Sequence, residues 1–386
     1  MKNHRMWLFW VVTGAAALLS AAQDSLKPLA EIYKGGTVRF VPELVLDESS
    51  LPEEAFFESV VDIKLDPDGS VYFCDYKANN IKKFDATGRY LKTIGRKGQG
   101  PGEFNMPFCI AVTAERLIVW DMGNRRLSQL TPDGSFLKSI PFQFGQGRPE
   151  RRRCLPDGNI VIGMEKTYFG EENRPQDYSI EIYSSDLEHK NTIYTQQVWR
   201  NRYIRIEKGT TNIPQPFTPM VYWDVSPDGK IIIGHSKNYE IEVHSSEKGR
   251  LFSFRHTYEP VKVTEKDKEM FFAGMVTSVG GVTKPGAPDY IVKNTEFPKE
   301  KPAFFDILVD SDGNILVSSH RKKREEESTT FDAFTPQGKF IGAFHVAGPT
   351  RSLYCFRGAA IRQGLFWAYE TGEEGSIKII KYRISG

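Results

Sequence analysis

Cysteine is scarce in this chain of 386 residues, and the four that occur stand apart from one another as Cys74, Cys109, Cys154 and Cys355. No two of them form a Cys-x-x-Cys pair, which gives a zinc knuckle no support. An oxidising compartment would permit a disulfide. Each cysteine nevertheless lies in or beside a strand pattern at a place where a small apolar side chain fits, and this favours buried free thiols.

Long apolar runs are missing apart from one near the amino terminus. Lys2 and Arg5 precede an apolar stretch at 7–19, and small residues follow at 20–22, which together indicate a secretory signal peptide at 1–22. A retained membrane anchor is the alternative, but the apolar run is shorter than the roughly 20 residues that a span requires. No cysteine follows the small residues, so a lipoprotein anchor is not indicated. We expect a secreted or periplasmic protein with no stable membrane span after cleavage.

The chain also has little net charge. Lys and Arg total 51 and Asp and Glu total 49, so loss of Lys2 and Arg5 with the signal peptide leaves 49 against 49. Electrostatic recognition must therefore come from the distribution of charge rather than its total. A secreted and neutral chain does not favour nucleic acid as a partner.

Several catalytic motifs are absent as well. The chain contains no Gly-x-Ser-x-Gly, no His-Glu-x-x-His and no phosphate-binding loop. The glycine-rich segment GQGPGEF at 98–104 precedes an expected strand rather than a helix, so it is not expected to cradle phosphate.

What the chain has in quantity is short strands separated by tight turns. Residues 61–104 contain four runs of alternating apolar residues, at 61–65, 71–74, 81–84 and 90–94. The breaks DPDG, DYKANN and DATG suit tight turns, because Pro presets φ, Gly accepts positive φ, and Asp and Asn bond their own backbone. Four strands in about 40 residues are the size of one propeller blade.

The same unit recurs along the chain, at 108–140, 151–199, 221–254 and 304–344, and a last unit at 355–384 has only three strands. The strand expected at 37–46 would complete this last unit by pairing with the C-terminal strand, which closes a ring and covers two sheet edges. An open solenoid is the less favoured arrangement. The prediction is an all-β, six-bladed β-propeller of four-stranded antiparallel blades at 37–386, after a linker at 23–36. One short helix is expected at 264–278, between blades 4 and 5, and a polar connector at 200–219.

The first two units carry a further pattern, in which Asp75 and Asn79 precede I-x-x-F and Asp121 and Asn124 recur in the next unit. With the loop at 98–104, this pattern resembles the NHL repeat, and the chain from about 37 to 385 resembles secreted bacterial six-bladed propeller proteins. The resemblance implies a fold and a location but no set of catalytic residues. We expect the Asp and Asn side chains to fix turns.

Long loops and insertions are expected to gather on one face of the ring, together with basic and aromatic residues that include Arg148 and Arg200. Such a surface suits a protein or an anionic or glycan ligand at the cell envelope, because Arg binds carboxylates in a bidentate manner and aromatic rings stack on apolar faces. Solvated loop charges are the alternative interpretation. The candidate ligand-binding residues are Arg126, Arg151, Arg152, Arg153, Tyr168, Arg202, His235, Tyr239 and His320.

A second hypothesis is an enzyme, a metal-assisted lyase or a lactonase-type hydrolase with its site over the central channel. Asp62 and Asp306 occur at equivalent positions of two inner strands and would hold Ca²⁺ or Zn²⁺. The corresponding positions in other units are Cys109, Arg151 and Tyr222, which do not complete a cation site. Structural roles for both Asp residues and the absence of a cofactor are therefore the leading expectation, and no catalytic residue is assigned.

Overall fold

The computed structural model describes residues 28–142, 147–168, 171–206, 209–279, 282–319, 330–347, 361–362, 364–371 and 375–386. The predicted signal peptide and the predicted ligand residue His320 lie outside these ranges. Within them, no helix is both long enough and apolar enough to cross a bilayer.

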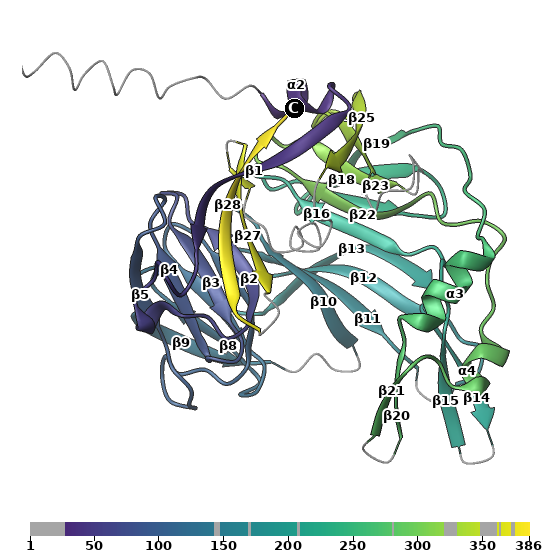
Figure 1. The fold of residues 1–386 in the computed structure, drawn as a ribbon, viewed down its shortest axis with the longest axis horizontal. Coiled ribbons are helices and arrows are strands. Elements are labelled where there is room, and N and C mark those ends of the chain that lie inside the picture. Colours follow the sequence, from purple (N-terminus) through teal and green to yellow (C-terminus); the bar gives the residue numbers. More distant parts are fainter. Residues whose placement is uncertain are drawn as a thin grey trace, which may run out of the picture.

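The strands form six blades that follow one another around a ring (Figure 1). Blade 1 consists of β2 (Val60–Leu65), β3 (Val71–Asp75), β4 (Asn80–Phe84) and β5 (Tyr90–Ile94), and blade 2 of β6 (Pro107–Val112), β7 (Leu117–Asp121), β8 (Arg126–Leu130) and β9 (Phe136–Pro141). Blade 3 consists of β10 (Gly147–Cys154), β11 (Ile160–Lys166), β12 (Gln176–Tyr183) and β13 (His189–Val198), and blade 4 of β16 (Val221–Val225), β17 (Ile231–His235), β18 (Glu240–Ser245) and β19 (Gly249–Arg255). Blade 5 consists of β22 (Phe304–Val309), β23 (Ile315–Ser319), β24 (Thr330–Phe334) and β25 (Phe340–Ala347).

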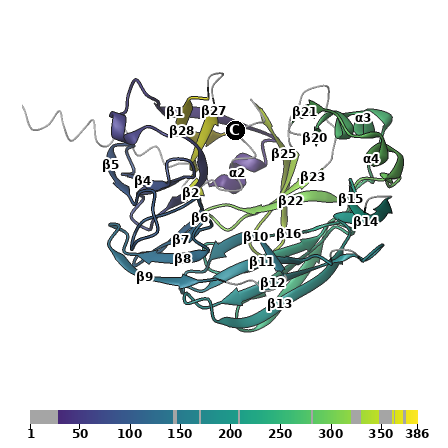
Figure 2. The ribbon, with the colours of Figure 1, turned by 90° about the horizontal axis from the view of Figure 1, so that it is seen from below.

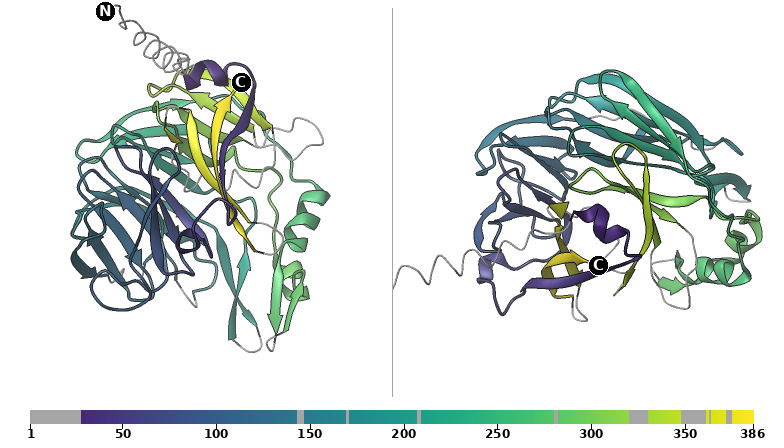
Figure 3. Two further views of the ribbon diagram at one scale, coloured as in Figure 1. Left: turned by 60° about the vertical axis from the view of Figure 1, so that its left-hand side comes forward. Right: turned by 90° about the horizontal axis from the view of Figure 1, so that it is seen from above.

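The sixth blade is built from both ends of the chain, as the sequence predicts. Strands β26 (Ile361–Arg362), β27 (Leu365–Thr371) and β28 (Ile377–Ser385) are completed by β1 (Thr37–Leu46), which pairs antiparallel with β28. Figure 3 shows the yellow C-terminal strands beside the purple β1. The first residues of β1 also pair in parallel with the end of β25, so blades 5 and 6 share one continuous eight-stranded sheet.

Among the described residues, six clusters of buried apolar side chains fill the spaces between successive blades. Blades 1 and 2, for example, enclose Tyr72, Ile81 and Leu117, while blades 6 and 1 enclose Phe73, Phe84 and Trp367. The remaining clusters lie between blades 2 and 3, 3 and 4, 4 and 5, and 5 and 6. Because each blade packs on two neighbours, its second strand is buried on both faces, and every residue of β3, β7 and β23 is buried.

The first strands of the blades surround the centre of the ring. Viewed from below, β6, β10, β16 and β22 converge there, while β9 and β13 lie outside (Figure 2). Adjacent inner strands contact one another in the order β22, β16, β10, β6 and β2. The short turns are formed as expected: in the turn of blade 1, the amide of Gly69 donates to the carbonyl of Asp66 at 3.0 Å with a φ of +89° at the glycine.

Two insertions depart from the sequence prediction. Residues 200–219, expected to be a connector, contain a hairpin of β14 (Asn201–Ile206) and β15 (Gly209–Pro214). The helix expected at 264–278 is α3 (Glu265–Ala273), capped as predicted by Thr264, and the residues after it form a hairpin of β20 (Val276–Val279) and β21 (Val282–Pro285). Gly274 ends the helix, and the β-branched residues that follow favour a strand.

A second helix, α4 (Asp289–Asn294), follows this hairpin, so the prediction of one helix between blades 4 and 5 is wrong. Both hairpins and both helices project from the same side of the ring (Figure 1). A short helix at residues 53–55 precedes blade 1.

Another short helix, α2 (Leu29–Tyr33), lies in the segment expected to be a linker. Leu29 and Tyr33 are buried against blades 5 and 6, and the hydroxyl of Tyr33 donates to Oδ2 of Asp310 at 3.0 Å. The described part of this segment is therefore packed on the propeller rather than connecting to it loosely.

Candidate functional site

A cavity of about 1000 Å³ opens where the inner strands of blades 1 to 5 meet. Its basic lining consists of Arg148, Arg151, Arg152, Arg153 and Arg200, and its acidic lining of Asp62 and Glu150. Its aromatic lining consists of Phe108, Tyr178, Phe217, Tyr222, Trp223 and Phe305. This mixture of charged planar groups and ring faces is typical of a site for a polar ligand that also has apolar faces.

Arg151 and Arg153 connect blade 3 to blades 4 and 5 beside the cavity. Arg151 forms an ion pair with Asp306 at 2.8 Å and donates to the carbonyl of Ile307 at 3.2 Å and to that of Trp223. Burial acts to lower the pKa of Arg151, but the Asp306 and Asp224 carboxylates hold that pKa above its ordinary value. Arg153 donates to Asp224 at 2.6 Å. These two predicted ligand residues therefore line the cavity with guanidinium groups that hold the blades together.

The side chain of Arg152, the arginine between them, is buried between blades 2 and 3. It lies over the Trp120 ring at 5.9 Å, and its Nη2 donates to the carbonyl of Pro149 at 3.3 Å. Burial lowers the pKa of Arg152, and only 5% of the residue is exposed. Although it borders the cavity, its role in the described contacts is packing.

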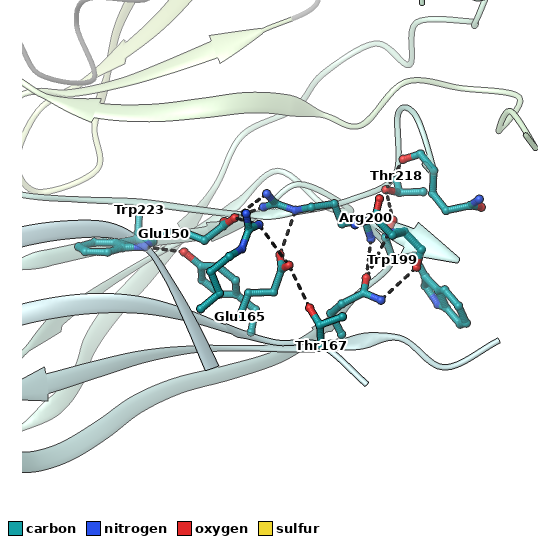
Figure 4. A network of polar contacts seen from close by, with 12 residues as sticks. Glu150, Glu165, Thr167, Trp199, Arg200, Thr218 and Trp223 are labelled. Carbon is teal, nitrogen blue, oxygen red and sulfur yellow. Dashed lines mark hydrogen bonds and ion pairs between the residues drawn. The ribbon is translucent and has the colours of Figure 1, made fainter. Parts of the chain in front are cut away.

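A network of two arginines and two glutamates lies beside the cavity, and Figure 4 shows Glu150, Glu165 and Arg200 of this network with their side chains pointing toward one another. Both terminal nitrogens of Arg200 bind the carboxylate of Glu150, at 2.6 and 2.7 Å. Nε of Arg200 lies 3.0 Å from Oε2 of Glu165, an ion pair without the geometry of a hydrogen bond. Arg148 completes the network, with Nη2 at 2.8 Å from Glu150 and 3.5 Å from Glu165.

The two glutamates of this network differ in their environment. Glu165 is 2% exposed, and burial raises its pKa above the usual range against the lowering effect of Arg200. Glu150 faces the cavity and is held by both arginines. Gln176 fixes the backbone of the network, because its Oε1 accepts from the amides of Arg200 and Asn201 at 3.0 and 3.2 Å.

Aromatic side chains form the rest of the wall. Phe108 on β6 is 47% exposed and lies edge-on to Tyr76 at 6.5 Å. Phe217, which follows the β14–β15 hairpin, has a φ of +56°, a left-handed conformation that is uncommon for a bulky residue. On the floor, the indole of Trp223 donates to the hydroxyl of Tyr178 at 2.9 Å, and burial raises the pKa of Tyr178 to about 12.

Three further predicted ligand residues are engaged elsewhere. Arg126 donates to Asp121 at 3.1 Å and to the carbonyls of Gln99, Gly100 and Glu103, so it fixes the loop at 98–104. Tyr168 donates to Asp177 and lies under the guanidinium of Arg174 at 3.3 Å. Arg202 donates to the carbonyl of Asn294 at 2.9 Å and pairs with Glu296 at 2.8 Å, which ties β14 to the end of α4.

The remaining two described candidates also lie apart from the cavity lining. Tyr239 is buried between blades 4 and 5 and donates to Asp332 at 2.8 Å, so its placement on an exposed rim is wrong. His235 is the last residue of β17 and is partly buried; burial, followed by the charge of Lys237, lowers its pKa. Of the predicted residues that the structure describes, only Arg151, Arg152 and Arg153 line the cavity.

The proposed metal ligands already have partners. Asp62 accepts from the amides of Ile63 at 3.0 Å and Ile110 at 2.9 Å and pairs with Lys64. Asp306 accepts from the amide of Ile307 at 2.9 Å and pairs with Arg151. Within the described residues, no group of three or more His, Cys, Asp and Glu side chains is placed to hold a metal ion. A cation at either carboxylate would have to displace these contacts.

The turn residues behave as expected from the sequence. The carboxylate of Asp75 accepts from the amides of Glu58, Ser59 and Ala78, and that of Asp121 accepts from Asn105 and Asn124. Cys74, Cys109 and Cys154 are free thiols, and burial raises the pKa of Cys109 and of Cys154 to about 12. Cys355 lies outside the described residues.

Two acidic members of the network, Glu150 and Glu165, have no counterpart among the sequence-based candidates. Glu150 lies within the basic run RPERRR at 148–153, and this alternation of charge is the one signal in the sequence that points to it. Glu165 ends an apolar strand pattern and resembles a solvated strand end. Its burial depends on Arg148 and Arg200, which approach from other elements.

Fold and cavity together define a six-bladed β-propeller with a polar site at one mouth of its channel. The model of the DUF5128 family, described as a 6-bladed beta-propeller, matches residues 52–146. A comparison with curated proteins finds no match.

Solved structures resemble the chain over almost its whole length. A DUF4221-family protein of Bacteroides vulgatus ATCC 8482 matches with a TM-score of 0.53 and 12% identity, over 91% of this chain and 99% of that one. A candidate exported protein of Bacteroides fragilis NCTC 9343 matches with a TM-score of 0.48 and 13% identity, over 91% and 99%. Virginiamycin B lyase of Staphylococcus aureus matches with a TM-score of 0.40 and 11% identity, over 88% and 98%. At such identities the likeness extends to the fold alone.

Proposed function

We propose that the protein is an exported binding propeller that holds a small polar ligand, or one segment of a glycan, in the cavity at the mouth of its channel. The observation that carries this proposal is the lining of the cavity, in which arginine and glutamate side chains lie next to Phe108, Phe217 and Phe305. Export is supported by the signal-peptide pattern at 1–22.

The shape of the site favours a small ligand over a folded protein partner. Pockets for small molecules and cofactors typically measure about 300–1,000 Å³, whereas stable protein–protein interfaces bury about 800 Å² of surface on each partner. A cavity of about 1000 Å³ lies at the upper end of the first range. It has room for a ligand of several rings.

Binding is favoured over catalysis because the polar side chains of the cavity are mostly engaged with one another. The carboxylate of Asp62 accepts from two backbone amides and pairs with Lys64, that of Glu150 pairs with Arg148 and Arg200, and the hydroxyl of Tyr178 accepts from Trp223. A general base or nucleophile would need a lone pair directed at the ligand. The described contacts hold the hydrogen-bond donors and ring faces of the cavity in fixed positions, and such an arrangement suits recognition of a ligand.

The experiment is a binding screen with a matched pair of variants. The mature protein is screened against a library of oligosaccharides and small organic acids by ligand-observed NMR, and hits are measured by calorimetry. Phe108→Ala removes an exposed ring from the cavity wall, while Leu137→Ala removes a side chain of similar exposure, 48%, from outer strand β9 of the same blade.

We expect Phe108→Ala to weaken binding of ligands that stack on this ring by at least about 2- to 10-fold, because a stacked ring contributes about 0.5–1.5 kcal/mol beyond the area it buries. Leu137→Ala should leave the affinity unchanged. Equal affinities for the two variants would place the binding site elsewhere. Conversion of a bound ligand into product, together with stoichiometric metal in the purified protein, would instead favour the metal-assisted lyase or lactonase.

A further inference from the structure

We propose that Arg148 is the residue that selects the ligand, and that the selected ligand carries a carboxylate on a ring. This inference rests on the proposed function, because it assigns a ligand class to the same cavity. Arg148 lines the cavity and its side chain is 65% exposed. Of its three nitrogens, Nη2 alone contacts the described residues, as the donor to Glu150 and Glu165.

Arg200 and Arg151, two other arginines of the cavity, are engaged more completely with the fold. All three nitrogens of Arg200 contact Glu150 or Glu165, and Arg151 is held by Asp306 and two backbone carbonyls. Their exposed fractions are 35% and 14%. Within the described residues, Arg148 therefore lines the cavity while the hydrogen-bond donors of its Nε and Nη1, on opposite sides of the guanidinium, remain available.

The charges around Arg148 favour a carboxylate over a phosphate. Arg148 and Arg200 balance Glu150 and Glu165, so the network is formally neutral before a ligand binds. A single negative charge can accept one charge-assisted hydrogen bond from Nε or Nη1 of Arg148. A phosphate monoester carries close to two charges at neutral pH and meets the repulsion of both glutamates.

The network also holds Arg148 in position. Glu150 is fixed by the bidentate contact with Arg200, and it in turn anchors Nη2 of Arg148 at 2.8 Å. Anchoring one nitrogen lowers the conformational entropy that the long side chain loses when a ligand binds. Phe217 and Phe108 line the same cavity and supply ring faces, which is why the carboxylate is expected on a ring rather than on a flexible chain.

The test compares paired probes by calorimetry on the mature protein. The probes are a trimer of galacturonic acid, the matching neutral trimer of galactose, galactose 6-phosphate and 4-hydroxybenzoate. They are titrated into the wild type, Arg148→Ala, Arg148→Lys and the control Arg255→Ala. Arg255 is 80% exposed and paired with Glu240 at 2.9 Å on β18, so it matches Arg148 as an exposed, ion-paired arginine outside the cavity lining.

We expect the wild type to bind at least one ring carboxylate about 10- to 100-fold more tightly than the neutral trimer, the factor that one charge-assisted hydrogen bond contributes. Arg148→Ala should remove this preference, so that the ratio of the affinities for the acidic and the neutral trimer falls to about 1. Arg148→Lys should restore part of it, because it keeps the charge but loses the planar fork. Arg255→Ala should behave as the wild type. Tighter binding of the uronate trimer indicates a glycan, and tighter binding of 4-hydroxybenzoate an aromatic acid.

Three results would overturn the inference. These are an acid preference that survives in Arg148→Ala, tighter binding of galactose 6-phosphate than of both carboxylates, and a wild type that binds neither carboxylate. None of them decides the proposed function, which is tested separately by the effect of Phe108→Ala on whichever ligands the screen identifies.

Discussion

The ion pair between Arg151 and Asp306 gives the sharpest test of how this propeller is held together. The two side chains are 14% and 11% exposed, and Arg151 reaches from blade 3 to backbone carbonyls of blades 4 and 5. Replacing Asp306 by Leu leaves a buried guanidinium without its ion-pair partner. Breaking such a pair by removing one partner costs about 3–5 kcal/mol, whereas replacing both partners with apolar residues is often nearly neutral.

We therefore expect Asp306→Leu to lower the free energy of unfolding by about 3–5 kcal/mol, and Arg151→Met to lower it by a similar amount. The double variant should lose no more than about 2 kcal/mol, so the two sites should show a coupling energy of several kcal/mol. The measurement is equilibrium unfolding in urea followed by tryptophan fluorescence, since Trp223 lies beside Arg151. The exposed pair of Arg255 and Glu240 is the control, and its disruption should cost at most about 1 kcal/mol.

Additive effects at Arg151 and Asp306, or a loss below about 1 kcal/mol in either single variant, would refute this account of the channel. The result also bears on function. If the coupling is large, charge reversal at 151–153 would disrupt the fold before it reported on a ligand, and loss of binding in such variants would not locate the site.

Three further predictions follow from local geometry. A chain that begins after residue 46 should aggregate in size-exclusion chromatography, because loss of β1 exposes the edges of β25 and β28. A chain that begins at residue 28 should stay monomeric. If both chains are equally soluble, β1 does not protect these edges. Burial raises the pKa of Asp310 to about 6, so the folded chain binds the proton more tightly than the unfolded chain and stability falls as pH rises from about 4 to 6. The turn of blade 4 has a serine, Ser226, at the position of Asp310. Asp310→Ser should therefore reduce the change in unfolding free energy between about pH 4 and 6, measured by urea unfolding, by up to about 3 kcal/mol. An unchanged dependence on pH would contradict the assignment. Gly163→Ala should lower the free energy of unfolding by about 1–3 kcal/mol, because a Cβ there would lie 2.2 Å from the Tyr178 hydroxyl. Gly274→Ala should change the free energy of unfolding little, because a Cβ at Gly274 would meet its neighbours at ordinary contact distances. Equal effects of the two substitutions would contradict this packing.

Much of the fold follows from local sequence signals. Turns such as 66–69 and 226–229, with apolar runs between them, predict the strands of the blades, because these signals act within a few residues. The unpaired strand at 37–46 and the incomplete last unit together predict the closure of the ring, which β1 and β28 confirm. The parallel contact of β1 with β25 involves three residues on each strand and has no counterpart in the pattern.

The insertions were less predictable because two local preferences compete there. The capping signal at Thr264 predicts the start of α3, but the end of that helix depends on whether Val276 prefers a helix or the partner strand offered by 282–285. The buried helix α2 is equally invisible in the sequence, since five residues are too short for a periodic signal.

The sequence by itself determined that this chain is a ring of antiparallel blades and that arginines gather near the start of blade 3 at 148–153. Only the tertiary structure decided what each arginine does. Arg151 and Arg153 meet carboxylates from blades 4 and 5, Arg152 meets a ring from blade 2, and Arg148 meets two glutamates through Nη2. Neighbours in a strand point to opposite faces, and their partners come from residues up to 156 positions away. A charge pattern alone therefore does not distinguish a structural arginine from one that binds a ligand.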